Sequence, residues 1–173
     1  LANLLACKGY KVAFWVFEPE VKEQIFNDRE NKVFLPGFRL SENLFPSDDL
    51  QAVVSGKDMV LAVPPSHVMR NVSSNMADAI AKDCIVVSAS KGIENETHLT
   101  MSGILAQTLG AETRLAVLSG PSFAKEVAAK MATAVTVASK DRAAAEAVQQ
   151  IFATPYFRVY TNDDMIGVEL GGS

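Results

Sequence analysis

Residues 59–87 read MVLAVPPSHVMRNVSSNMADAIAKDCIVV, with an apolar run of strand length at each end. Between the two runs, apolar residues recur at the spacing of one helical face, at Met69, Val72, Met76 and Ile80. The pair Pro64–Pro65 stops the first run and suits a turn that opens a helix, with Ser66 near the helix cap. The stretch therefore predicts a strand, a helix and a second strand in succession.

The same alternation continues in both directions along the chain. Further strands are expected at 12–17, 115–118, 133–138 and 157–160. Further helices are expected at 1–9, 19–28, 101–110, 122–129 and 144–152. Strands that are apolar throughout are typical of a parallel sheet covered on both faces, so the pattern predicts a doubly wound α/β fold with a mostly parallel sheet.

The first expected strand, at 12–17, is followed by a helix and then by a turn-rich segment. In the helix at 19–28, the side chains of Val21, Ile25 and Phe26 are expected to face inward. Residues 31–46 contain Pro36–Gly37 and Pro46, and the abundance of turn residues predicts an irregular excursion there.

The composition suits one medium domain. The 173 residues are 49% hydrophobic and 21% charged, which excludes a disordered chain and a disulfide-stapled miniprotein. No uninterrupted apolar run approaches the roughly 18 residues of a membrane span, and the net charge of −4 gives no general attraction to nucleic acid. Cys7 and Cys84 are far apart and belong to no CxxC motif, so we expect no metal site and two buried thiols in a reducing compartment.

In open α/β sheets, ligands bind beyond the carboxyl ends of the strands, and four such places carry suitable residues. The first is Trp15–Glu18, where an acid could hold a ribose and an aromatic ring could cover an adenine. Taken alone, these residues fit a core Trp beside a surface Glu better. The second is Val63–Pro64, where proline turns the backbone aside and leaves room for a flat ligand, although an ordinary strand-to-helix turn has the same residues.

The third place is Ser88–Glu94, where small residues lead from a strand end to Lys91. A lysine there can neutralise a phosphate or polarise a carbonyl, and Gly92 permits backbone conformations that other residues resist. Most lysines are merely solvated, but few follow a buried strand between Ser and Gly.

The fourth place is Ser119–Glu126, where Gly120 and Pro121 precede an expected helix. Free backbone N–H groups at a helix start favour an anion, and the hydroxyl of Ser122 adds a donor. A well-capped helix explains these residues almost as well, and Ser122 lacks the G-x-S-x-G context of a hydrolase nucleophile. The two histidines, His67 and His98, suggest no catalytic pair and are expected on the surface or at helix ends.

Taken together and in order, these segments resemble the nucleotide-binding half of NAD(P)-dependent glycerol-3-phosphate dehydrogenase. The resemblance covers nearly the whole chain and rests on WVFE at 15–18, EN at 30–31, FLPG at 34–37, VP at 63–64, SKGIE at 90–94, SGPSFAKE at 119–126, FRVY at 157–160 and IGVELGG at 166–172. It implies an incomplete, Rossmann-type NAD-binding domain over residues 1–173.

The resemblance also implies an activity and its site residues. The reaction is reversible hydride transfer between NAD(P)H and carbon 2 of glycerol 3-phosphate, with dihydroxyacetone phosphate as the ketone. The enzyme would be a cytoplasmic homodimer that feeds glycerophospholipid synthesis. The residues implied for the substrate are Lys91, Gly120 and Ser122, and those implied for the cofactor are Phe17, Pro64, Lys91 and Ala124.

The residue at position 17 bears on the choice of cofactor. Phe17 stands where many bacterial members of the family carry Arg or His beside the adenosine. Without that cation, and with Glu18 adjacent, the extra phosphate of NADP is disfavoured, so NAD is expected as the cofactor and NADP is the alternative.

Three departures from the family pattern are expected. The first strand and its G-x-G-x-x-G loop should precede Leu1, because residues 1–9 match the helix that follows this loop. The family's proton-acceptor Lys should follow just after Ser173, and an all-helical substrate domain should come next. The printed chain therefore contains no catalytic proton acceptor and is expected to be inactive by itself.

Two other interpretations remain open at this point. One is another dehydrogenase of the same architecture, of the hydroxyacid or 6-phosphogluconate type. The other is a non-catalytic nucleotide-binding module.

Overall fold

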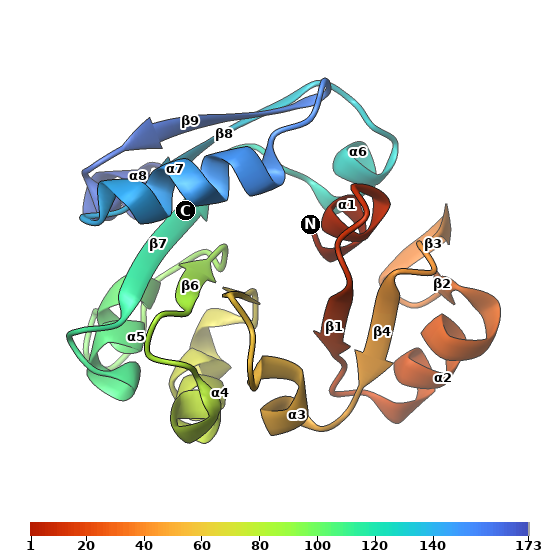
Figure 1. Ribbon diagram of the computed structural model, residues 1–173, viewed down its shortest axis with the longest axis horizontal. Helices are drawn as coiled ribbons and strands as arrows, with labels where there is room; N and C mark the ends of the chain where they lie inside the picture. Colours follow the sequence, from red (N-terminus) through yellow and green to blue (C-terminus); the bar gives the residue numbers. More distant parts are fainter. Residues whose placement is uncertain (173) are drawn as a thin grey trace.

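The computed structural model describes residues 1–172, and Figure 1 shows how their helices and strands are arranged. The α-helices are α1 (Ala2–Cys7), α2 (Pro19–Asp28), α3 (Leu50–Val54), α4 (Met69–Met76), α5 (Met101–Leu109), α6 (Ala124–Ala128), α7 (Arg142–Phe152) and α8 (Met165–Gly171). The strands are β1 (Val12–Trp15), β2 (Glu30–Asn31), β3 (Leu35–Arg39), β4 (Leu44–Ser47), β5 (Met59–Ala62), β6 (Ile85–Ser88), β7 (Arg114–Ser119), β8 (Thr133–Ala138) and β9 (Phe157–Asn162). Two 3-10 turns, Ser66–Val68 and Ala77–Ala79, flank α4.

The main sheet has five strands in the order β5-β6-β7-β8-β9. Its neighbouring strands are parallel except for β7 and β8, which are antiparallel. The expected doubly wound, mostly parallel α/β fold is therefore confirmed, and β8 and β9 run antiparallel to the other three strands. Burial on both faces makes a strand apolar whichever way it runs, so the residue pattern of 133–138 does not determine its direction.

Strand β6 shows that helices cover both faces of the main sheet. Ile85 and Val87 point into a core that includes side chains of α1, α6 and α7. Val86 points into a second core, which is formed with α3, α4 and α5. Because all three side chains are buried, this strand reads as a continuous apolar run rather than an alternating one.

A smaller parallel sheet pairs β1 with β4, and the hairpin β2–β3 lies beside it. Its core joins Val21 and Ile25 of α2 to Leu44 of β4. The expected irregular excursion at 31–46 is therefore wrong, because this segment contains all of β3 and parts of β2 and β4. Strand β4 has only one fully buried side chain and contains Pro46, so its strand state depends on pairing with β1.

Several local details also differ from expectation. Phe26 is 68% exposed and does not face inward, because successive helical residues are about 100° apart and Phe26 lies a full step beyond Ile25. Strand β1 ends at Trp15, so Phe17 lies in the loop that follows. Helix α6 begins at Ala124 rather than at Ser122, and helices α3 and α8 were not expected. Cys84 is buried, which raises the pKa of its thiol, but Cys7 is exposed.

Lys8 joins the beginning of the chain to the end of α7. Its ammonium donates hydrogen bonds to the carbonyl oxygens of Gln150, Ile151 and Ala153 at 3.0, 2.6 and 2.7 Å. These carbonyls lie at the C-terminal end of the helix, where a cation is favoured by the helix dipole. Burial lowers the pKa of Lys8.

Within residues 1–172, no helix is long and apolar enough to cross a bilayer. In the same part of the chain, no three His, Cys, Asp or Glu side chains gather as a metal site would require.

Candidate functional site

The candidate site lies at the carboxyl ends of β5, β6 and β7. These three strands are parallel neighbours, with Ala62 opposite Ser88 and Ser88 opposite Val117. The segments that follow them therefore emerge at one edge of the sheet. The loops that carry Pro64, Lys91 and Gly120 follow these adjacent strands and therefore begin at the same edge of the sheet.

Hydrogen bonds fasten the first two of these loops together. The backbone N–H of Ala89 donates to the carbonyl of Ala62 at 3.0 Å, and the hydroxyl of Ser90 donates to the carbonyl of Pro64 at 2.5 Å. Gly92 has a φ of +99°, and a Cβ there would lie 3.3 Å from the hydroxyl of Ser66. The loop that carries Lys91 thus packs directly on the turn that carries Pro64.

Lys91 itself is exposed, and its ammonium forms no hydrogen bond or ion pair with any residue between 1 and 172. The position of this charge is set by the backbone of its loop. A lysine without a protein partner at a ligand-binding sheet edge is available to a phosphate or to a carbonyl oxygen.

The third loop follows β7 and is held close to β8. Gly120 has a φ of +148°, and a Cβ there would lie 3.0 Å from the carbonyl oxygen of Ala134 and from Cα of Val135. The N–H of Ser122 donates to the carbonyl of Gly120 at 2.9 Å, so this amide is already used within the loop. Because α6 is only five residues long and begins at Ala124, the expected anion site at a helix start is weaker here than the sequence suggested.

The adenosine end of the expected site lies on the smaller sheet. Phe17 follows β1 and is 76% exposed, with its ring 6.1 Å from that of Trp15 in an edge-to-face arrangement. The indole N–H of Trp15 donates to the carbonyl of Asp48 at 3.1 Å, so Trp15 has a structural role and Phe17 is the open aromatic surface. No hydrogen-bonded strand pairing links this sheet to the one that carries Pro64 and Lys91 within the described chain.

An ion pair that the sequence analysis did not recognise anchors the Lys91 loop. Glu94 accepts hydrogen bonds from Nε and Nη2 of Arg70 at 2.8 and 2.7 Å, and from the hydroxyl of Thr97 at 2.5 Å. Nη2 of Arg70 also donates to Gln107 of α5 at 3.0 Å. The hydrogen bonds from Arg70 and Thr97 lower the pKa of Glu94 to about 2, so this carboxylate remains ionised at neutral pH.

A second unrecognised contact holds α8 against the start of α5. The carboxylate of Glu169 is buried and accepts hydrogen bonds from the N–H and the hydroxyl of Ser102 at 2.8 and 2.6 Å. At the end of α8, Gly172 lies so close to Ser119 that a Cβ would collide with its hydroxyl. Helix α8 therefore reaches the edge of the sheet where Gly120 lies.

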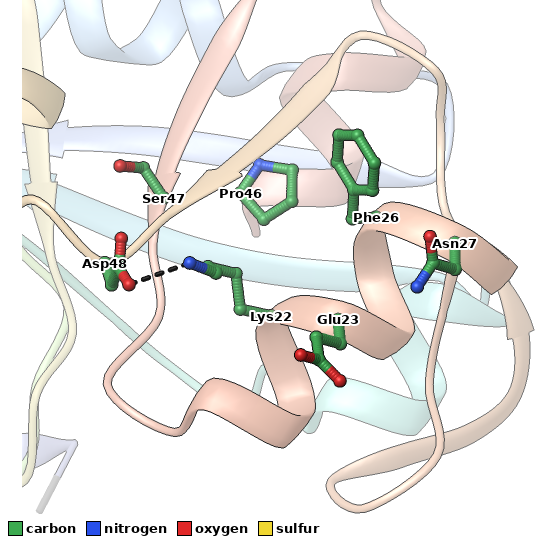
Figure 2. Close-up of a pocket in the computed structure, with 7 residues that line it drawn as sticks. All are labelled: Lys22, Glu23, Phe26, Asn27, Pro46, Ser47 and Asp48. Carbon is green, nitrogen blue, oxygen red and sulfur yellow. Dashed lines mark hydrogen bonds and ion pairs between the residues drawn. The ribbon is translucent and has the colours of Figure 1, made fainter.

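A shallow hollow of about 390 Å³ lies elsewhere, between α2 and the end of β4 (Figure 2). The ion pair of Lys22 and Asp48, at 2.7 Å, crosses it. None of the residues expected to bind substrate or cofactor lines this hollow.

The two histidines, His67 and His98, are both exposed, as expected, and neither forms a side-chain hydrogen bond with Lys91.

The comparisons with known proteins agree on one family. The family described as NAD-dependent glycerol-3-phosphate dehydrogenase N-terminus matches residues 1–145. The glycerol-3-phosphate dehydrogenase [NAD(P)+] of Syntrophobacter fumaroxidans is 49% identical over 175 aligned positions, and that of Citrifermentans bemidjiense is 50% identical. Both alignments cover 100% of this chain and 52% of the relative, so the chain spans about half the length of these proteins.

Solved structures give the same result. The crystal structure of glycerol-3-phosphate dehydrogenase from Coxiella burnetii is 35% identical, with a TM-score of 0.91, over 99% of this chain and 52% of that one. The glycerol-3-phosphate dehydrogenase of Plasmodium falciparum, at 23% identity and a TM-score of 0.92, shares the fold. The chain therefore belongs to the NAD-dependent glycerol-3-phosphate dehydrogenase family, of which it matches the N-terminal part.

Proposed function

We propose that this chain is the nucleotide-binding domain, residues 1–173, of a glycerol-3-phosphate dehydrogenase. The full-length enzyme would transfer a hydride reversibly between NAD(P)H and dihydroxyacetone phosphate, with glycerol 3-phosphate as the reduced product. The observation that carries the proposal is the loop of Lys91, which is hydrogen-bonded to Pro64 through Ser90 and follows the strand next to the one that precedes Gly120, with the Lys91 ammonium unpartnered within residues 1–172. Its support is the match to this family over residues 1–145.

The residues at this edge fit a small phosphorylated ketone. Lys91 would contact the substrate and the cofactor, where its charge compensates the phosphate or the developing charge on the reacting oxygen. Gly120 would let the backbone approach the substrate without a side chain, and the hydroxyl of Ser122 would donate to it. The proton acceptor is the Lys that we place just after Ser173, in the full-length protein.

The residues also fit a dinucleotide cofactor. Phe17 offers an exposed aromatic face for the adenosine. Pro64 follows β5 and Ala124 begins α6, and both would contact the cofactor. When bound, the nicotinamide supplies or accepts the hydride. The glycine-rich loop that we place before Leu1 would hold the pyrophosphate.

The remaining features belong to the full-length enzyme. We propose a C-terminal helical domain after residue 173 that closes over the substrate and contributes much of a homodimer contact. Glycerol 3-phosphate is the backbone of glycerophospholipids, which supports a role in their synthesis in the cytoplasm.

The proposed reaction is tested with the full-length protein, NADH and dihydroxyacetone phosphate. We expect NADH oxidation that depends on dihydroxyacetone phosphate and does not occur with 2-keto acids. We also expect no reduction of NAD(P)+ by 6-phosphogluconate. Absence of this activity would overturn the proposal. The flanking coding sequence is the complementary test: Lys-Asn soon after Ser173 supports the enzyme, whereas a gene that begins at Leu1 and ends at Ser173 supports a non-catalytic module.

Cofactor preference is tested by replacing Phe17 with Arg in the full-length enzyme. The new guanidinium would face the adenosine ribose, where it can pair with the 2′-phosphate of NADP. We expect the ratio of kcat/KM for NADPH over NADH to rise by about tenfold, since one charge-assisted contact contributes roughly that much. A Phe17→Leu variant controls for loss of the ring, and an unchanged ratio in Phe17→Arg would contradict the adenosine assignment.

A further inference from the structure

Lys91 lies in the loop between β6 and α5, and its side chain has no hydrogen-bond or ion-pair partner in the described part of the chain. Lys91 is exposed and unpartnered within residues 1–172, so the backbone of this loop determines the point from which its side chain reaches toward a ligand. If this loop were free to change position, the charge on Lys91 would shift with it. A catalytic or binding charge loses effect when it is misplaced by about 1 Å.

The loop is closed on itself by backbone hydrogen bonds around Glu94. The N–H of Glu94 donates to the carbonyl of Leu99 at 2.9 Å, and the N–H of His98 donates to the carbonyl of Glu94 at 2.9 Å. Ile93 forms an isolated bridge with Thr100, directly before α5. Backbone contacts thus tie residues 93–100 together, and Lys91 lies two residues before this segment.

One ion pair ties this piece to the helices behind it. Arg70 stands on α4 and forms a two-pronged contact with both carboxylate oxygens of Glu94, while its Nη2 also reaches Gln107 of α5. The Glu94 side chain is only 17% exposed, so this pair is better shielded from solvent than an ordinary surface pair. A bidentate contact fixes both distance and orientation, which a single hydrogen bond does not.

We propose that Arg70 and Glu94 are positioning residues, whose ion pair fixes the loop and thereby places the Lys91 ammonium at the carboxyl edge of the sheet. This inference rests on the proposed function. Neither residue need touch the substrate, because each acts through Lys91.

The test uses Arg70→Ala in the full-length enzyme, with Arg114→Ala as the matched control. Arg114 forms an ion pair of 2.7 Å with Asp141, and its side chain is about as exposed as that of Arg70 (34% against 38%), but it lies at the opposite end of β7 from the site. We expect Arg70→Ala to raise KM for dihydroxyacetone phosphate and lower kcat/KM by about ten- to a hundredfold, as misplacement of a binding charge does. Arg114→Ala should leave both constants close to those of the wild type.

Three further measurements separate positioning from a general loss of stability. Arg70→Lys keeps the charge but not the fork, so it should recover only part of the activity. In a Lys91→Ala background, Arg70→Ala should cost little more, because the residue through which it acts is already gone. Amide hydrogen exchange at residues 91–94 should speed up in Arg70→Ala and not in Arg114→Ala.

The outcomes are distinguishable. A wild-type enzyme without activity toward dihydroxyacetone phosphate overturns the proposed function and the positioning role with it. An active wild type, together with unchanged KM in Arg70→Ala or fully additive effects of Arg70→Ala and Lys91→Ala, overturns the positioning role alone. Faster exchange without a kinetic change would show that the pair only stabilises the loop.

Discussion

Replacing Lys91 with Ala in the full-length enzyme is expected to lower kcat/KM for dihydroxyacetone phosphate by about a hundredfold or more. The expected loss is large because the ammonium would make a charge-assisted contact in a site that excludes water when the enzyme closes. The side chain forms no hydrogen bond or ion pair within residues 1–172, so its removal takes away no internal polar interaction. Steady-state kinetics with NADH and varied ketone phosphate measure the effect.

The control for this variant exploits the exposed surface. Lys82 is also exposed, but it lies before β6, at the opposite end of this strand from Lys91. Lys82→Ala should therefore retain normal kinetics. If Lys91→Ala also retains near-normal kinetics and the wild type is active, the role assigned to Lys91 is rejected.

Replacing Glu169 with Ala is expected to lower local stability by about 2–3 kcal/mol, the usual cost of deleting hydrogen bonds to a charged group. Its carboxylate is buried and accepts two hydrogen bonds from Ser102, so the deletion leaves an N–H and a hydroxyl of α5 without their acceptor. Native-state amide hydrogen exchange of α5 and α8 in the full-length protein measures the loss.

Two milder variants separate the contributions of the two hydrogen bonds that join Ser102 and Glu169. Ser102→Ala removes only the hydroxyl and should cost about 1 kcal/mol. Glu169→Gln keeps the shape and one carbonyl acceptor for the Ser102 N–H, so its cost should lie between those of the other two variants. Exchange rates in α8 that are the same in Glu169→Ala and the wild type would show that this carboxylate does not hold α8 to α5.

The fold was predictable where burial alone determines the element. Ile85, Val86 and Val87 are apolar because helices cover both faces, and that pattern is visible in the sequence. Strand β4 was missed because Pro46 and Ser47 give it no such pattern, and its pairing with β1 depends on residues more than thirty positions earlier. The antiparallel direction of β8 was missed because burial does not depend on strand direction.

The candidate site was predictable only at strand ends. Pro64 and Lys91 directly follow apolar runs, so their place at one sheet edge follows from parallel pairing. Arg70 and Glu94 are 24 residues apart, and Ser102 and Glu169 are 67 apart, and no local pattern joins either pair. Such contacts arise from how the helices pack, which the order of apolar and polar residues does not specify.

The contact of Lys8 with the end of α7 can form only late in the synthesis of this chain. The ammonium cannot reach the carbonyl of Ala153 until 145 further residues have been synthesised. At about 5–20 residues per second, the ribosome needs on the order of ten seconds to produce them. Helix α1 can pack on the smaller sheet earlier, through Ala6, but its contact with the end of α7 forms only after the chain as far as Ala153 has been synthesised.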